Sequence, residues 1–188
     1  MEPVSRSQYA AHAIQIWPSI GERAVGAPRR EGSKVANVQE KILEELTRSY
    51  FMELETVMNY IANSTNLVGA KAEPIKQSLF ADVAEEIGHA QTIAKRIHVL
   101  GGAVPGSGEF KPGQKTLQPP SDACDVVSVI RGVIDAEGGA VEQYKKIIGL
   151  CSEANDPVTE DMCVTLLADE EEHKRDFEGF LMEYEREM

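Results

Sequence analysis

Four glutamates in this chain lie within apolar helical patterns, where charged side chains are unusual. They follow the same three-and-four spacing as the hydrophobic residues around them, and they are Glu53, Glu86, Glu137 and Glu170. A buried carboxylate without a partner costs several kcal/mol. We therefore expect these four side chains to share a partner of opposite charge.

Two of the glutamates are followed three residues later by a histidine. The pairs are Glu86 with His89 and Glu170 with His173. Residues three apart share one face of a helix, so each pair can bind one metal ion. A single Glu-x-x-His match is weak evidence by itself, because glutamate is common on helices.

The spacing of these residues repeats along the chain. Residues 84 positions apart are identical in type at four places, which are Glu53 and Glu137, Tyr60 and Tyr144, Glu86 and Glu170, and His89 and His173. The two halves otherwise differ, so the match indicates two related helix pairs that build one shared site.

The charges and ligand types of this set favour two iron ions per chain. Four carboxylates balance the charge of two Fe(II) ions, so the filled site can be buried at little electrostatic cost. Mixed carboxylate and imidazole ligands suit iron or manganese. Zinc prefers tetrahedral sites with fewer oxygens, and calcium and magnesium do not require histidine.

Composition sets the class of protein. The 188 residues are 42% hydrophobic, enough for one domain with a full core. A formal charge of -12 opposes binding to nucleic acid and to anionic membranes, despite a small basic cluster at Arg23, Arg29, Arg30 and Lys34.

Cysteine usage and hydropathy bear on the compartment. The three cysteines, Cys124, Cys151 and Cys163, form no C-x-x-C pair. No stretch approaches the roughly 20 apolar residues of a membrane span, and the start of the chain lacks a signal-peptide pattern. We expect a cytoplasmic protein with structural thiols.

Helical periodicity predicts four long helices that position the glutamates. The first runs over 38–66, the second from Pro74 to Leu100, the third from about Asp125 to Cys151, and the fourth from Pro157 to the end, with Asp156 as its cap. Residues 101–123 hold five glycines and four prolines, so we expect neither a helix nor an internal strand there but a long crossover. The expected fold is an all-α four-helix bundle of two antiparallel pairs.

The first 36 residues contain several helix breakers, which are Pro3, Pro18, Gly21, Gly26, Pro28 and Gly32. We therefore expect an N-terminal arm over residues 1–36 and a single four-helix domain over residues 37–188.

Residues 38–187 resemble the bacterioferritin and Dps-like branch of the ferritin superfamily. The resemblance rests on the motifs ELETVMNY, AEEIGHAQTIAKRIHVLGG, EGGAVEQY and LADEEEHKRDF. It implies that Glu86 and Glu170 bridge two iron ions, with Glu53 and His89 at one end and Glu137 and His173 at the other. Tyr60 and Tyr144 would support these ligands or pass an electron, or would simply pack in the core.

The same resemblance implies a ferroxidase that oxidises Fe(II) with dioxygen or hydrogen peroxide, for iron storage or for detoxification. Haem-binding relatives carry methionine where this chain has Ile87, so we expect no haem. The chain ends at Met188 without the short fifth helix of 24-subunit cages, which favours a homo-oligomer of 12 subunits or fewer. All six ligands lie on one chain, unlike conventional Dps proteins, so DNA protection is not implied.

Two alternatives remain at this level. One is a rubrerythrin-like peroxidase or another di-metal carboxylate oxidase without mineral storage, although the C-x-x-C module of rubrerythrins is missing. The other is a structural bundle whose glutamates pair with Lys or Arg. Five further acidic residues are expected on solvent-facing surfaces, and they are Glu55, Glu85, Asp169, Glu171 and Glu172.

Overall fold

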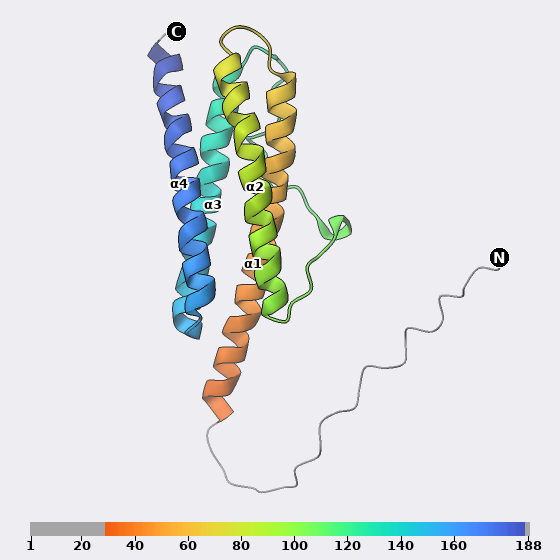
Figure 1. The fold of residues 1–188 in the computed structure, drawn as a ribbon, viewed down its shortest axis with the longest axis vertical. Helices are drawn as coiled ribbons and strands as arrows, with labels where there is room; N and C mark the ends of the chain where they lie inside the picture. The colour runs from red at the N-terminus through yellow and green to blue at the C-terminus, as the bar shows by residue number, and fades with distance from the viewer. Residues whose placement is uncertain (1–28, 187–188) are drawn as a thin grey trace, which may run out of the picture.

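The computed structural model describes residues 29–186, with side chains from residue 37 onward. Four long helices lie along one axis (Figure 1), and they are α1 Arg29–Asn66, α2 Glu73–Val99, α3 Val126–Ala154 and α4 Pro157–Arg186. Residues 29–186 contain no strand. The structure confirms the predicted all-α four-helix bundle.

The helices form two antiparallel pairs, α1 with α2 and α3 with α4, and α1 also packs against α3. The crossover returns along the bundle, so that α3 runs parallel to α2 (Figure 1). The crossover contains one short 3-10 turn, η1 Ser107–Glu109. The expectation of no helical structure in this segment was therefore wrong over three residues.

Side-chain caps and turn residues set the helix ends near the predicted places. Asp125 accepts a hydrogen bond from the backbone nitrogen of Ser128 at 3.0 Å, and Asp156 accepts one from that of Thr159 at 3.1 Å. Helix α3 ends at Ala154 and is capped by Asn155, whose φ of 54° is the left-handed conformation that asparagine tolerates.

Helix α1 begins at Arg29, nine residues before the predicted start at Val38. The glycine at position 32 costs only about 1 kcal/mol relative to alanine in a helix, too little to stop a helix of 38 residues. Residues 1–28, including most of the predicted arm and Arg23, lie outside the described residues. The division into an arm at 1–36 and a domain at 37–188 stays a prediction.

The apolar core consists of two clusters, one toward each end of the bundle. The first contains Tyr60, Leu67, Ile75, Leu79, Leu117, Ile130, Val133 and Phe177 among others. The second contains Ile42, Leu46, Ile93, Ile97, Tyr144, Ile147, Cys151 and Cys163 among others. The four glutamates of interest lie between these clusters along their helices, at the middle of the bundle.

The crossover is tied to the bundle by polar contacts with α1. Glu55 accepts hydrogen bonds from the backbone nitrogens of Gly113 and Gln114, each at 2.9 Å. Asn63 donates to the carbonyl of Leu117 at 2.9 Å, and the Leu117 side chain is fully buried. These bonds hold the long connection against the helix that carries Glu53.

Over residues 29–186, none of the helices has the length and apolar character that a membrane crossing requires.

Candidate metal centre

The six residues singled out in the sequence lie together inside the bundle. Each side chain is buried, with at most 8% of the residue surface exposed, and the residues are Glu53 on α1, Glu86 and His89 on α2, Glu137 on α3, and Glu170 and His173 on α4. All four helices therefore contribute to one cluster, as the helical phase predicted.

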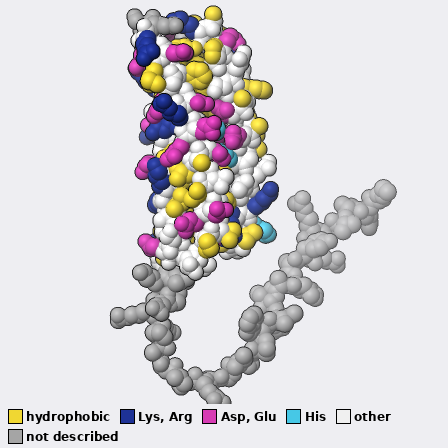
Figure 2. Space-filling view, turned by 60° about the vertical axis from the view of Figure 1, so that its left-hand side comes forward, with side chains coloured by type: hydrophobic (Ala, Val, Ile, Leu, Met, Phe, Trp, Pro, Cys, Tyr) yellow, Lys and Arg dark blue, Asp and Glu magenta, His cyan; other side chains and the backbone are white. Residues whose placement is uncertain are grey.

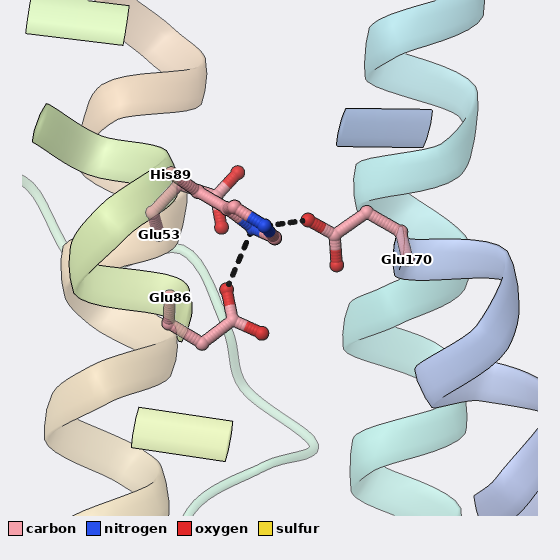
Figure 3. Close-up of side chains that lie close together, drawn as sticks. All are labelled: Glu53, Glu86, His89 and Glu170. Atoms are coloured by element: carbon pink, nitrogen blue, oxygen red, sulfur yellow. Dashed lines mark ion pairs between the residues drawn. The ribbon is translucent and has the colours of Figure 1, made fainter. Parts of the chain in front are cut away.

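The cluster divides into two ligand groups that share two glutamates. One group is Glu53, Glu86, His89 and Glu170 (Figure 3), and the other is Glu86, Glu137, Glu170 and His173. Within each group, the possible ligand atoms lie within 4.8 Å of one another. A pair of neighbouring metal ions would need this arrangement, with Glu86 and Glu170 facing both positions.

Both histidines turn Nδ1 toward the shared glutamates. The Nδ1 of His89 lies 3.1 Å from a Glu170 oxygen and 3.6 Å from a Glu86 oxygen (Figure 3). The Nδ1 of His173 lies 3.2 Å from Glu86 and 3.9 Å from Glu170. Of the two shared glutamates, each ring thus lies nearer to the one on the opposite helix, so side chains of α2 and α4 meet at the cluster.

The buried polar atoms of the cluster fit a metal. Both carboxylate oxygens of Glu86, both of Glu170, and the Nδ1 atoms of His89 and His173 make no hydrogen bond within the described part of the chain. Buried polar atoms without partners are rare in folded proteins, because their desolvation is not repaid. Six such atoms facing one another make a site that cations would satisfy.

Burial and mutual repulsion keep protons on the cluster when no metal is bound. Burial, with repulsion from nearby carboxylates, raises the pKa values of Glu53 and Glu170 well above the ordinary range and that of Glu137 to about 7. Although burial acts in the opposite direction, contacts with the two histidines lower the pKa of Glu86 to about 2. Metal ions would replace these protons.

The pKa values of the two histidines are raised, which complements the lowered pKa of Glu86. Burial alone would lower their pKa values, but the contact with Glu86 raises the pKa of His89 and raises that of His173 to about 10. The metal-free cluster therefore balances its charge with protonated rings. Metal binding must displace these protons, which makes binding depend on pH.

Two buried tyrosines support the outer glutamates across the bundle. The Tyr60 hydroxyl on α1 donates to Glu137 on α3, and the Tyr144 hydroxyl on α3 donates to Glu53 on α1. The sequence had left open whether these tyrosines support the ligands or pack in the core. They do both, since each ring is fully buried in one of the apolar clusters.

Three of the acidic residues expected to face solvent have specific partners within the chain. Glu55 is only 5% exposed and holds the crossover, so that expectation was wrong. Glu85 is exposed, as expected, and Asp169 is half-buried, and each carboxylate lies 3.4 Å from the Nε2 of a buried histidine. The sequence contained a signal for Glu85 and Asp169, because these two acidic residues are 84 positions apart, as are the residues of the repeat.

Other candidates from the sequence stay outside the cluster. Cys151 and Cys163 are buried free thiols of the second apolar cluster, and burial raises their pKa values to about 11 and 12. Such thiols are inert, as expected of structural cysteines. His98 is exposed on α2 and His12 lies outside the described residues.

Comparison with known proteins places this geometry in a family. The family described as "Ferritin-like domain" matches residues 43–186. The DNA protection during starvation protein of Pyrococcus furiosus is 26% identical over 153 residues, covering 76% of this chain and 77% of that protein. The bacterioferritin of Desulfovibrio desulfuricans is 24% identical, covering 74% and 73%. These proteins are distant homologues.

Solved structures show the same fold. A ferritin-like di-iron carboxylate protein from Bacillus anthracis superposes with a TM-score of 0.68 at 20% identity, over 77% of this chain and 97% of that one. A dodecameric thioferritin, the bacterioferritin-related protein of Bacteroides fragilis, superposes with a TM-score of 0.66 at 23% identity, over 82% and 95%. The buried glutamates and histidines are therefore consistent with a di-metal carboxylate site.

Proposed function

The chain belongs to the ferritin-like domain family, and on that premise we propose that it is a ferroxidase, which binds two Fe(II) ions per chain and oxidises them with dioxygen or hydrogen peroxide. The observation that carries the proposal is the set of buried polar atoms on Glu86, His89, Glu170 and His173 that face one another and make no hydrogen bond in the described part of the chain. A structural bundle would pair such glutamates with Lys or Arg. In the described part of the chain, Glu86 and Glu170 form ion pairs with the two histidines and with no Lys or Arg.

Each residue of the cluster has a separate role in binding the two ions. Glu86 and Glu170 lie in both ligand groups, so they hold both ions, while Glu53 with His89 completes one end and Glu137 with His173 the other. Tyr60 and Tyr144 keep the outer carboxylates in place. Full burial of the shared glutamates keeps bulk water from competing for the ions.

The reaction balances with the two bound ions as substrate. Two adjacent Fe(II) ions lose one electron each, so that together they supply an electron pair. Dioxygen accepts the pair with two protons to give hydrogen peroxide, or hydrogen peroxide accepts it with two protons to give two water molecules. Manganese is the other metal that the mixed carboxylate and imidazole ligands suit.

One relative bears on the assembly that we propose. The Bacteroides fragilis protein is dodecameric, and we propose a homo-oligomer of 12 subunits or fewer for this chain, in the cytoplasm. In a closed shell, oxidised iron would be stored; in a smaller assembly, the same reaction would remove peroxide or dioxygen.

The decisive experiment is an anaerobic Fe(II) titration followed by oxidant addition, monitored by absorbance, with the assembly mass measured on the same sample. Two ions per chain, oxidised rapidly, are expected from the unchanged protein. The Glu86→Gln, Glu170→Gln double variant should lose both properties, whereas Glu172→Gln, at an exposed position on the same helix, should retain them. Normal oxidation by the double variant would refute the proposed site.

The same titration separates storage from a small di-metal oxidase. Continued iron uptake beyond two ions per chain, in a large assembly, would support storage. Binding that stops at two ions, with repeated turnover of peroxide, would favour an oxidase or a rubrerythrin-like peroxidase instead.

A further inference from the structure

Ser49 on α1 is a buried polar residue without a hydrogen bond. The residue is 1% exposed, and its hydroxyl oxygen is among the buried side-chain atoms that have no hydrogen-bond partner in the described part of the chain. An unpaired buried hydroxyl destabilises a fold, because the hydrogen bonds that it made to water are not replaced. Serine is therefore an unfavourable residue at this position unless its hydroxyl finds a partner in another state of the protein.

The other buried serine, threonine and asparagine side chains of α1 have partners. Three of them bond to the crossover, and they are Thr56, Asn59 and Asn63. Ser64 donates to the carbonyl of Ile61 at 3.2 Å. A serine within a helix commonly bonds to the carbonyl four residues earlier. For Ser49 that carbonyl belongs to Glu45, and it accepts a hydrogen bond from Gln143 of α3 at 3.1 Å instead.

The nearest part of the metal cluster along α1 is Glu53, one helical turn after Ser49. Side chains lean toward the N-terminus of their helix, so the Glu53 side chain lies over the turn that carries Ser49. Glu53 faces the other ligands of its group (Figure 3), and one of its oxygens accepts a hydrogen bond from Tyr144. A carboxylate has about four acceptor positions, so Glu53 can bind a metal ion and still accept from a second hydroxyl.

The other half of the bundle has no hydroxyl at the related position. Val133 on α3 follows Ser49 by 84 residues and precedes Glu137 by one turn. It is fully buried and belongs to the first apolar cluster. Valine donates no hydrogen bond from its side chain, so Glu137 lacks the neighbour that Glu53 has.

We propose that Ser49 is a positioning residue for one end of the site: its hydroxyl donates a hydrogen bond to the Glu53 carboxylate when that carboxylate binds a metal ion. The hydroxyl can reach this geometry by rotation of its own side chain, with no movement of the helix. The inference rests on the proposed di-metal function and deepens it, because it makes the Glu53 end of the site different from the Glu137 end.

The proposed role differs from a general attraction for cations. Acidic side chains gather over the middle of the bundle in Figure 2, and their charge attracts cations toward both ends of the site. The Ser49 hydroxyl is uncharged and buried, so its effect should be confined to the end that contains Glu53.

The test measures Co²⁺ binding to the full chain by calorimetry and by visible absorbance, which report binding without an oxidation step. Ser49→Ala should weaken the binding of one of the two ions by about tenfold and change the absorbance band. In a Glu137→Ala background, which retains the Glu53 end, the same loss is expected. In a Glu53→Ala background, Ser49→Ala should have no further effect, because the acceptor of its hydrogen bond is already gone.

Two matched substitutions separate the hydroxyl from the shape of the side chain. Ser49→Thr keeps a hydroxyl, and Ser49→Val has nearly the same shape without one, so the Thr variant should bind Co²⁺ about tenfold more tightly than the Val variant.

The matched control is Ser64→Ala, which removes a paired hydroxyl from the same helix. It should leave Co²⁺ binding unchanged but lower the urea midpoint of the metal-free chain. Ser49→Ala should do the reverse, since it removes an unpaired hydroxyl and should leave that midpoint unchanged or raise it.

Several results would overturn the role of Ser49. Ser49→Ala could leave Co²⁺ binding unchanged in the Glu137→Ala background, or weaken it as much in the Glu53→Ala background. The Thr and Val variants could bind Co²⁺ equally. The Glu137→Ala chain could bind no Co²⁺, which would mean that the two ends are not separable.

Failure of the proposed function has a different signature. A chain that binds two Co²⁺ ions and shows the Ser49 effect, yet does not oxidise Fe(II), would refute the ferroxidase and leave the role of Ser49 in place. An unchanged chain that binds no Co²⁺ would refute both.

Discussion

The two halves of the molecule, α1 with α2 and α3 with α4, carry the same residue types at the buried metal cluster and different ones at positions away from it. The agreeing positions are the six cluster residues and the two tyrosines. Three differing pairs, again 84 residues apart, are Arg48 and Gly132, Glu55 and Gly139, and Asp82 and Leu166. The agreeing residues face the same cluster, whereas the differing residues have different neighbours.

The crossover accounts for two of these differences. Glu55 accepts hydrogen bonds from the backbone of the crossover. Gly132 lies against the crossover, where a Cβ atom would come within 2.5 Å of the Thr116 carbonyl oxygen. The positions related to them, Gly139 and Arg48, are exposed. The shared site thus requires the same residue types at related positions of both halves. The crossover occurs only once, so it can favour different residue types at related positions.

The largest expected effect tests whether the two ends of the site are equivalent. Glu53→Gln and Glu137→Gln each remove a carboxylate from one end of the site. Each should lower the affinity for one of the two ions by more than about a hundredfold, since residues that only support a ligand already contribute about 10- to 100-fold. Anaerobic Fe(II) titration measures both affinities. A large loss in only one variant would show that the halves are not functionally alike.

A smaller effect is expected where the halves differ beneath the crossover. Gly132→Ala should lower the free energy of unfolding by about 1–3 kcal/mol, because the new methyl group overlaps backbone atoms of Thr116 and Leu117 that cannot easily move. The matched change in the other half, Arg48→Ala, should stay within about 0.5 kcal/mol. Urea unfolding of both variants provides the comparison, and equal costs would contradict the packing argument.

The third difference, Asp82 against Leu166, should appear as a pH dependence. Burial raises the pKa of Asp82 to about 6; His173 opposes the shift, and Glu86 and Glu85 add to it. A carboxyl whose pKa is raised on folding contributes stability at low pH that is lost as the pH rises from its ordinary value of 3.8 through about 6.

Asp82→Asn should therefore raise the melting temperature of the metal-free protein at pH 8 and have little effect at pH 4. The measurement is thermal unfolding at both pH values in the presence of a chelator. The Leu166 side of the bundle offers no titrating group at the related position, so Leu166→Met, a swap of similar volume, serves as the control and should show no dependence on pH. A gain for Asp82→Asn only at low pH would reverse the assigned sign.

The smallest effect concerns Gly139, the counterpart of Glu55. The glycine is exposed within α3, and a Cβ atom there would meet only the Met52 methyl group at 3.9 Å. Gly139→Ala should thus stabilise the protein by about 0.5–1 kcal/mol, through the helix preference of alanine. Glu55→Ala should instead destabilise it, because the backbone nitrogens of Gly113 and Gln114 lose their hydrogen-bond acceptor and the crossover is held less firmly to α1. Urea midpoints of the two variants should shift in opposite directions.

The sequence by itself determined the four helices and which residues face inward. Apolar residues at helical spacing predict a buried face, and a glutamate in phase with them must share that face, so Glu53 and Glu137 could be placed without coordinates. The 84-residue repeat linked the halves, and glycine and proline marked the crossover. The start of α1 was misplaced, because one glycine does not outweigh the helix preference of its neighbours.

Only the tertiary structure decided which side chains meet across helices. Helical phase gives a face but not the neighbour on another helix, so the contacts of Asp169 with His89 and of Tyr60 with Glu137 could not be derived from spacing. Glu55 resembles any exposed glutamate in sequence, and it is buried because the crossover covers it. The path of that crossover depends on long-range packing, such as the close approach at Gly132, which local sequence does not encode.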